Sequence, residues 1–165
     1  MPQLSLHTPL GEITLSEDEG VIVALDWGRG SEQEATPLLR EARDQLHDYF
    51  DGRRAHFQLP LAPHGTPYQR RVWAALCTIP AGETRSYADI ARDVASHPRA
   101  VGQANGRNPI PILIPCHRVV AANGTLGGYS GLDGPETKRY LLALEARTLQ
   151  QAGTASPPPD PGKSP

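Results

Sequence analysis

The chain has 165 residues, of which 38% are apolar and 21% charged, a composition typical of one ordinary globular domain or two small ones. No apolar run is long enough to span a membrane, and the N-terminus lacks a basic segment followed by an apolar one, so we expect a cytoplasmic protein without a secretory signal. Two cysteines are too few for a disulfide scaffold, and the six histidines show no metal-ligand spacing, so we expect no metal and no other cofactor.

The net charge of −2 conceals a difference between the two halves of the chain. Residues 1–65 hold 5 Lys or Arg and 11 Asp or Glu, whereas residues 66–150 hold 10 and 6. A basic C-terminal half is consistent with a polyanionic partner such as nucleic acid, although an excess this small is more often an ordinary solvated surface. Charge alone therefore leaves nucleic-acid binding open.

The N-terminal residues carry the patterns of a small sheet followed by a helix. Residues 3–27 alternate apolar and polar positions around turn residues at 9–11 and 18–20, which predicts an antiparallel meander. From Thr36 the apolar residues recur at intervals of three and four until Gly52, which predicts an amphipathic helix with glycine just after its C-terminus.

Residues 60–65, which contain two prolines and a glycine, are the best candidate for a linker. We therefore predict an α+β protein with an N-terminal sheet-and-helix domain over 1–62 and a mainly helical domain over 63–150. Residues 151–165 are rich in proline and cannot bury a core, so we expect a disordered tail.

Three helices are predicted in the first part of the second domain. Thr66 and Pro67 supply a cap and a first-turn proline for a helix whose apolar stripe includes Cys77, interpreted as a small core residue. Ser86 resembles the first residue of a capping box, and a further helix begins at Pro98 and closes at Gly106. Two short helices joined by a tight turn are typical of a helix-turn-helix motif.

The second helix of this motif carries the small residues Ala100, Gly102 and Ala104. Small residues let a backbone approach another helix or a nucleic-acid groove closely. On spacing alone, helix packing is the commoner reason, and the groove stays the alternative.

A last helix is predicted over residues 136–149, with Leu141 and Leu149 facing inward. Glu145 lies four residues from each, so it shares the buried stripe. A buried carboxylate needs a partner, and a histidine elsewhere in the fold would serve. The alternative is a carboxylate at the edge of the stripe that reaches solvent.

The segment 112–119 places Cys116 beside His117 and Arg118, at the end of a short apolar stretch. A thiol is nucleophilic only as thiolate, and we expect the basic neighbours to lower its pKa. On an extended strand Cys116 and His117 point to opposite faces, so a bend at Pro115 or a bridging water is needed before the histidine could take the proton.

Glu145 could then orient the imidazole of His117 and complete a nucleophile–base–orienter arrangement around Cys116. The alternative is a buried structural cysteine beside a capped histidine at a strand end. The residues alone do not decide between these two interpretations.

The stretch 108–120, Asn-Pro-Ile-Pro-Ile-Leu-Ile-Pro-Cys-His-Arg-Val-Val, strongly resembles the active-site segment of the O6-alkylguanine-DNA alkyltransferases. The similarity extends from the linker to Glu145, and the acidic N-terminal half looks like the variable N-terminal domain of that family. The resemblance implies a bacterial-type methyltransferase that repairs duplex DNA by irreversible, single-turnover transfer of the alkyl group of O6-alkylguanine, and of O4-alkylthymine, to its own cysteine. It also implies that the damaged base is flipped out of the duplex, that the protein is a monomer without a metal, and that it associates with the nucleoid when bound to DNA. Cooperative binding to DNA is left open.

The resemblance assigns the chemical roles residue by residue. Cys116 matches the alkyl acceptor, His117 the base that deprotonates it through a water, and Glu145 the acid that orients the histidine. Asn108 matches the hinge asparagine before the active-site strand. Tyr87 matches the tyrosine that crowds the 3′ phosphate and donates a proton toward guanine N3.

The resemblance also implies DNA and base contacts. Arg99 matches the arginine that fills the space left by the rotated nucleotide, with the recognition helix in the minor groove, and Arg118 is interpreted as a further duplex contact. The remaining implied contacts to DNA are Ala100, Gly102, Ala104 and Arg107. The residues implied to bind the base, through a carbonyl or a covering loop, are Val119, Tyr129 and Ser130.

The turn before Arg99 is shorter than the family usually shows, and the loop before Lys138 is slightly longer. Two other functions compete with alkyl transfer. A non-catalytic lesion-binding relative would lack the acceptor, whereas Cys116 is present. A thiol hydrolase would use Cys116 and His117 but would not need the rest of the motif.

Overall fold

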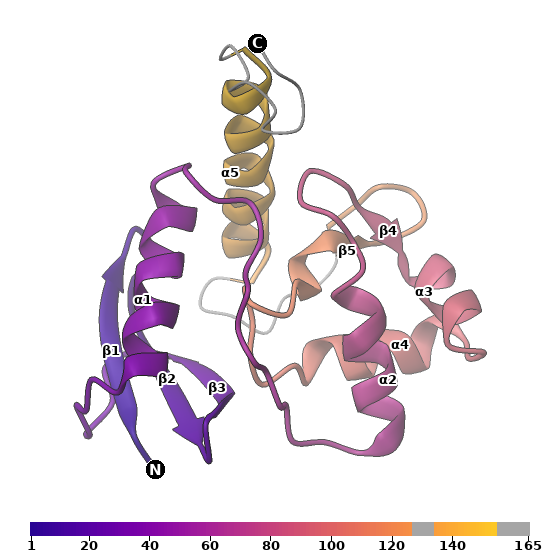
Figure 1. Ribbon diagram of the computed structural model, residues 1–165. Helices are drawn as coiled ribbons and strands as arrows, with labels where there is room; N and C mark the ends of the chain where they lie inside the picture. Colours follow the sequence, from indigo (N-terminus) through magenta and orange to yellow (C-terminus); the bar gives the residue numbers. More distant parts are fainter. Residues whose placement is uncertain (127–133, 155–165) are drawn as a thin grey trace, which may run out of the picture.

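A three-stranded antiparallel sheet forms the N-terminal part of the molecule (Figure 1). In the computed structural model, which describes residues 1–126 and 134–154, its strands are β1 (Gln3–Thr8), β2 (Gly11–Asp18) and β3 (Val21–Trp27), in the order β1-β2-β3. Glu19 and Gly20 join β2 to β3 with φ angles of 49° and 81°, as a two-residue hairpin turn requires. The predicted meander is confirmed.

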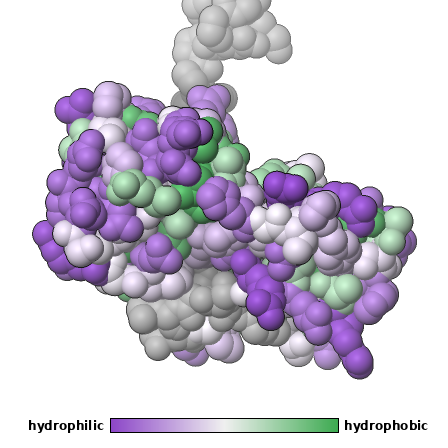
Figure 2. Space-filling model, turned by 90° about the horizontal axis from the view of Figure 1, so that it is seen from below, coloured by the Kyte–Doolittle hydropathy of each residue, from purple (hydrophilic) through white to green (hydrophobic). Residues whose placement is uncertain are grey.

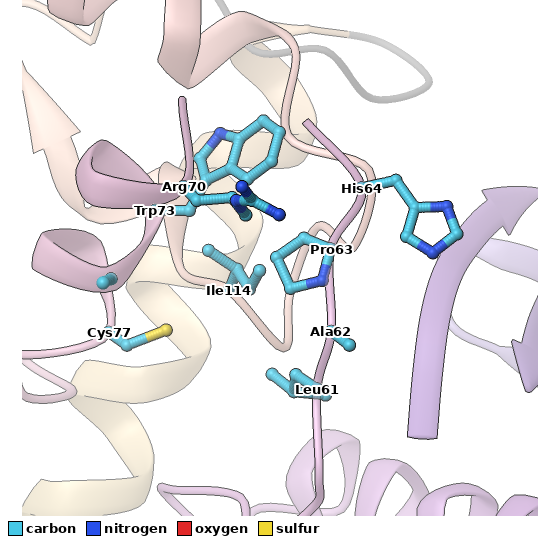
Figure 3. Close-up of a pocket in the computed structure, with 9 residues that line it drawn as sticks. Leu61, Ala62, Pro63, His64, Arg70, Trp73, Cys77 and Ile114 are labelled. Atoms are coloured by element: carbon cyan, nitrogen blue, oxygen red, sulfur yellow. The ribbon is translucent and has the colours of Figure 1, made fainter. Parts of the chain in front are cut away.

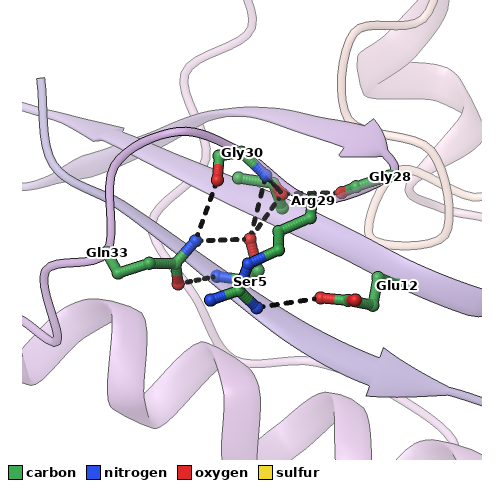
Figure 4. A network of polar contacts seen from close by, with 7 residues as sticks. Ser5, Glu12, Gly28, Arg29, Gly30 and Gln33 are labelled. Atoms are coloured by element: carbon green, nitrogen blue, oxygen red, sulfur yellow. Dashed lines mark hydrogen bonds and ion pairs between the residues drawn. The ribbon is translucent and has the colours of Figure 1, made fainter.

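The segment after β3 is fastened to the sheet by a network of hydrogen bonds (Figure 4). The Gly30 N–H donates to Thr14 Oγ1 at 2.7 Å, and the Gln33 side chain binds both the N–H and the hydroxyl of Ser5, at 3.0 and 2.8 Å. A Cβ on Gly30 would lie 2.7 Å from Thr14 Cγ2, so this close approach requires glycine. The network covers part of the β1 edge.

Helix α1 (Pro37–Phe50) packs on this sheet and confirms the predicted amphipathic helix. The Thr36 hydroxyl caps it by accepting a hydrogen bond from the Leu39 N–H at 3.1 Å, and Gly52 follows its end with a φ of 79°. Its buried face includes Tyr49, whose exposed fraction is 1%. The helix thus delivers a tyrosine to the boundary with the rest of the chain.

The segment predicted as a linker is attached to β3 over part of its length. The Ile22 N–H donates to the Pro60 carbonyl and the Ala62 N–H donates to the Ile22 carbonyl, each at 2.9 Å. The Leu25 N–H donates to the carbonyl of Pro109 at 3.0 Å. These bonds dock the N-terminal sheet directly against the segment that leads to Cys116.

Three helices follow: α2 (Pro67–Leu76), α3 (Tyr87–Asp93) and α4 (Pro98–Gly106), with the two-residue strand β4 (Arg85–Ser86) before α3. Helices α3 and α4 pack together as the predicted helix-turn-helix pair (Figure 1).

Both predicted helix starts are confirmed, because Thr66 with Gln69 and Ser86 with Asp89 form reciprocal capping boxes. The prediction for Cys77 is wrong. Helix α2 ends at Leu76, so Cys77 is its C-cap residue and is exposed rather than buried in the core.

Helix α5 (Pro135–Thr154) is longer than predicted. Glu145 is buried with 1% of its surface exposed, as expected, but Leu149 is 41% exposed, so its predicted inward position is wrong. In Figure 1 the C-terminal turns of α5 extend beyond the neighbouring elements. Residues 151–154 belong to this helix, not to a disordered tail, and residues 155–165 lie outside the described part of the chain.

The surface seen from below in Figure 2 is mainly hydrophilic, with small apolar patches between the polar residues. Within the described ranges, no helix is both long and apolar enough to cross a membrane. The visible face is thus suited to contact with water or with a polar partner.

Candidate active site

The side chain of Asn108 shapes the loop that leads to Cys116. Its Oδ1 accepts a hydrogen bond from the Ile110 N–H at 2.9 Å, and its Nδ2 donates to the Ile114 carbonyl at 2.8 Å. The loop between them contains Ile112, whose φ of 75° is unusual for a β-branched residue. Asn108 therefore closes a tight, buried loop immediately before the cysteine, which is where a hinge residue was expected.

Cys116 does not lie on a strand as predicted. Residues Cys116–Arg118 form a 3₁₀ turn, and the strand β5 (Val119–Val120) begins only after it, pairing in parallel with β4. Pro115 has φ −81° and ψ 64°, which is far from strand geometry, so the chain turns before the thiol. The alternation that would send Cys116 and His117 to opposite faces therefore does not apply.

Four hydrogen bonds converge on the buried carboxylate of Glu145. Its Oε2 accepts from Tyr49 Oη at 2.6 Å and from Arg118 Nη2 at 2.8 Å, and lies 2.7 Å from His117 Nε2. Its Oε1 accepts from Arg118 Nε at 2.9 Å. Burial by itself would raise the pKa of Glu145, but the hydrogen bonds and charges of His117 and Arg118 outweigh it and lower the pKa to about 2. The carboxylate is thus ionised at neutral pH.

Burial lowers the pKa of His117, and Arg118 and Lys138 lower it further, while the hydrogen bond and charge of Glu145 act in the opposite direction. The imidazole is therefore neutral at neutral pH, and Arg118 is the cation that balances Glu145. A neutral ring beside a carboxylate carries its proton on Nε2. Nδ1 of His117 is buried and has no hydrogen-bond partner among the described residues, so its lone pair can accept a proton.

Cys116 is buried, with 1% of its surface exposed. Burial raises the pKa of its thiol to about 11, although Asn108 and the charge of Lys138 lower it. The prediction that basic neighbours bring this pKa down is therefore wrong for the resting protein. Arg118 does not serve the thiol, because its guanidinium binds Glu145 and, through Nη1, the Ile79 carbonyl at 2.6 Å. For the same reason Arg118 is not a duplex contact.

Tyr87 and Lys138 stand close to the thiol. The Lys138 ammonium lies 5.9 Å from the centroid of the Tyr87 ring, and Lys138 has no exposed surface. Burial lowers the pKa of Lys138 to about 8, while the nearby Cys116 raises it. Burial, followed by the charge of Cys116, raises the pKa of Tyr87. Helices α3 and α5 thus bring a phenol and an ammonium to the cysteine.

Helix α4 carries the residues expected to contact DNA. Arg99 is exposed in its first turn, Ala100 and Gly102 are partly exposed, and Arg107 is exposed directly after its end. Ala104 does not reach the surface, because it is 3% exposed and its carbonyl accepts a hydrogen bond from Trp73 Nε1 at 2.8 Å. Of the small residues, Ala100 and Gly102 are thus partly accessible, whereas Ala104 packs against α2.

The chain also matches models of a known protein family. Residues 67–147 match the model described as 6-O-methylguanine DNA methyltransferase, DNA binding domain. Residues 4–63 match the model described as 6-O-methylguanine DNA methyltransferase, ribonuclease-like domain. The chain belongs to the 6-O-methylguanine DNA methyltransferase family.

Individual relatives agree with this assignment. The constitutive methylated-DNA–protein-cysteine methyltransferase of Bacillus subtilis is 49% identical over 152 residues, covering 84% of this chain and 92% of that protein. The methyltransferase of Mycobacterium tuberculosis strain H37Rv is 44% identical, covering 86% and 90%. The crystal structure of M. tuberculosis OGT in complex with DNA matches with a TM-score of 0.81 and 42% identity, covering 90% and 94%. The family expected from the sequence, its enzyme class and the α+β fold are confirmed.

Sequence reasoning missed three residues of this methyltransferase site. Tyr49 looks like an ordinary core position of an amphipathic helix. Asn105 lies on α4, and its Nδ2 donates to the Cys116 carbonyl at 3.3 Å. The buried position of Lys138 could have been predicted. Lys138 lies three residues before Leu141, and Leu141 lies four before Glu145, so all three share one helical face.

Of the three residues expected to bind the base, Val119 lies in the described part of the chain. Val119 is completely buried at the start of β5, where it pairs with Arg85. Tyr129 and Ser130 lie outside the described residues. Within the described ranges, no group of three His, Cys, Asp or Glu side chains could hold a metal ion.

A separate, mainly apolar cavity of about 390 Å³ lies between residues 61–64 and α2 (Figure 3). Trp73, Cys77 and Ile114 are among its lining residues, whereas Cys116 does not line it. The exposed cysteine and the buried one therefore belong to different surroundings.

Proposed function

We propose that the protein repairs duplex DNA by transferring the alkyl group of O6-alkylguanine, and of O4-alkylthymine, to Sγ of Cys116, once per molecule. The observation that carries this proposal is the arrangement of His117 and Glu145 next to Cys116. His117 is neutral, its Nε2–H is held by the ionised Glu145, and its Nδ1 has no partner among the described residues. Membership of the methyltransferase family supports DNA alkyl transfer as the reaction class.

The reaction begins with proton transfer from the Cys116 thiol to Nδ1 of His117, directly or through one water. The imidazolium that forms is stabilised by Glu145. The thiolate then attacks the alkyl carbon, so that the S–C bond forms as the C–O6 bond breaks and its electron pair passes to guanine. Tyr87 donates a proton to the departing base, and the proton on His117 replaces it. In net terms the thiol loses one proton and the base gains one, and the products are guanine and an alkylated cysteine.

The raised pKa of Cys116 fits a thiol that reacts only with a correctly placed lesion. With a pKa of about 11, forming the thiolate at neutral pH costs about 5 kcal/mol. This cost already includes the favourable charge of the Lys138 ammonium, and proton transfer to His117 couples it to the reaction. At rest the thiol is neutral and shielded, and is therefore inert toward solution oxidants and electrophiles.

Single turnover follows from the chemistry of the product. A thioether does not undergo the exchange reactions that regenerate a thiol from a disulfide. Each molecule therefore acts once, as a stoichiometric reagent.

The lesion must leave the duplex to reach a thiol that is 1% exposed, and flipping a base costs a few kcal/mol. We propose that α4 lies in the minor groove, with Ala100 and Gly102 allowing close approach and Arg107 contacting phosphate. Arg99, exposed in the first turn of α4, fills the space of the rotated nucleotide. Ala104 is left out of this interface because its side chain is buried.

In this proposal the carbonyls of Cys116 and Val119 bind the guanine amino group, while Tyr129 and Ser130 cover the base. Residues 1–62 form one domain and residues 63–150 the other. Action as a monomer, in the cytoplasm and at the nucleoid, stays a prediction.

The test is loss of the lesion from a duplex mixed with an equimolar amount of protein. The wild type should remove O6-methylguanine, Cys116→Ser should leave it intact, and the matched control Cys77→Ser should behave as wild type because Cys77 is exposed and lines a different cavity. Binding without loss of the lesion would instead indicate a lesion-binding protein. Continued loss under excess DNA would indicate a hydrolase.

A further inference from the structure

Tyr49 links the N-terminal part of the molecule to the acid of the acceptor site. It lies on α1, and its hydroxyl donates a 2.6 Å hydrogen bond to Oε2 of Glu145 on α5. Both side chains are buried, each with 1% of its surface exposed. A buried tyrosine hydroxyl needs a hydrogen-bond partner, and the partner of Tyr49 is the carboxylate that also binds His117.

We propose that Tyr49 is a positioning residue for alkyl transfer, which acts by clamping the Glu145 carboxylate in the orientation that keeps the His117 proton on Nε2. Its effect on the reaction rests on the proposed function above. The N-terminal domain is then part of the chemical machinery, because it supplies one of the hydrogen bonds that set the state of the base.

The arrangement of donors explains why one hydroxyl matters. Among the described residues, Oε2 of Glu145 has Tyr49, His117 and Arg118 as partners, whereas Oε1 has Arg118 Nε alone. The guanidinium already binds both oxygens, at 2.9 and 2.8 Å, and the Tyr49 hydroxyl adds a further donor to Oε2. Without the hydroxyl, Oε2 is held less firmly and the carboxylate can turn while it keeps its contact with the guanidinium. Such a turn lengthens the 2.7 Å contact to His117 and weakens the preference for the Nε2–H tautomer. The other tautomer carries a proton on Nδ1 and cannot accept one from Cys116.

The ring of Tyr49 is held independently of its hydroxyl. It packs edge-on against Phe50, with 5.3 Å between ring centroids, and at 40° to Phe57, with 5.1 Å between centroids. Tyr49→Phe should therefore keep the packing and remove only the hydrogen bond. This makes the role of the hydroxyl separable from the role of the ring.

The clamp also sets the charge felt by His117. The groups that act on its pKa are Glu145, Arg118 and Lys138, and Tyr49 acts through the carboxylate. A carboxylate that has turned away from His117 raises the pKa of the imidazole less, so Tyr49→Phe should lower this pKa. Because His117 must be neutral to accept the thiol proton, the acidic limb of the rate profile should move to lower pH.

The experiment measures single-turnover transfer from the free base O6-methylguanine across pH, so that DNA contacts play no part. Tyr49→Phe should slow transfer about tenfold near neutral pH and shift the acidic limb to lower pH. Tyr68→Phe is the matched control, since its hydroxyl lies 2.8 Å from Ser96 Oγ, in another part of the fold. It should match the wild type in both readouts. An unchanged rate and profile in Tyr49→Phe would overturn the proposal, even if that variant were less stable.

Nitrogen NMR of the His117 imidazole tests the clamp without any substrate. The wild type should show the Nε2–H tautomer, and Tyr49→Phe a mixture of both. Identical spectra would overturn the clamp. A clear difference in a protein that transfers no alkyl group would support the clamp and reject the proposed function, so the two failures are distinguishable.

Discussion

Replacing Arg118 by methionine removes the cation that balances Glu145 while retaining most of the apolar volume. In the wild type the guanidinium, in a residue only 6% exposed, donates twice to Glu145 and once to the Ile79 carbonyl. Arg118→Met therefore leaves a buried carboxylate whose remaining partners among the described residues are Tyr49 and His117, and leaves the Ile79 carbonyl without this donor.

Breaking a buried ion pair from one side costs about 3–5 kcal/mol, because the remaining charge is uncompensated. A typical domain is stable by about 5–15 kcal/mol, so this loss is a large fraction of the total. For a chain of this size, roughly 2–4 °C of melting temperature corresponds to each kcal/mol, which predicts a fall of about 10 °C.

Urea unfolding followed by tryptophan fluorescence measures this free energy. Arg118→Lys should lie between the wild type and Arg118→Met, since it keeps the charge but cannot form the two-point contact. The double variant Arg118→Met, Glu145→Leu should lose less than the sum of its single variants, because it removes both charges. A loss below about 1 kcal/mol in Arg118→Met would refute the reasoning that Arg118 is the counter-ion of Glu145.

Two further predictions follow from the same site and from α4. The pKa of Glu145 is about 2 in the folded protein and ordinary when unfolded, so its ionisation stabilises the fold by about 3 kcal/mol above pH 4.5. That stability should be lost as the pH falls from 4.5 through 2, and acid titration of Glu145→Gln should lack this step. Arg99→Ala should slow repair of duplex about tenfold or more but leave reaction with the free base unchanged. The control Arg147→Ala, on α5, should leave both reactions unchanged. Equal losses on both substrates would exclude Arg99 as the flipping residue.

Local signals in the sequence predicted the elements well. The capping residues Thr66 and Ser86 start their helices where expected, and the inward position of Glu145 followed from its spacing on α5. These features depend on neighbours within one or two turns, which the sequence displays directly.

The wrong predictions concern properties that depend on tertiary contacts, namely the exposure of a side chain and the pKa of a thiol. Leu149 is exposed near the C-terminal end of α5, and Cys77 is exposed directly after α2 ends at Leu76. The pKa of Cys116 was predicted in the wrong direction, because burial raises it and Arg118 binds Glu145 instead of the thiol. No periodicity reveals which partner a side chain chooses.

Tyr49 could not be recognised for a related reason. Its helical spacing is that of a core residue, and its partner Glu145 lies 96 residues further along the chain. Only the packing of α1 against the C-terminal part of the molecule brings the two together. Non-local hydrogen bonds of this kind have no signature in a single sequence.

Peptide mapping by mass spectrometry, after exposure of the intact protein to excess O6-methylguanine duplex, locates the transferred group. We expect one methyl substituent per protein molecule, on the peptide that carries Cys116, with the peptide of Cys77 unmodified. The amount of O6-methylguanine converted to guanine within the duplex should equal the amount of protein and then stop rising. A methyl group elsewhere, or continued repair by an unmodified Cys116, would contradict single-use transfer to this thiol.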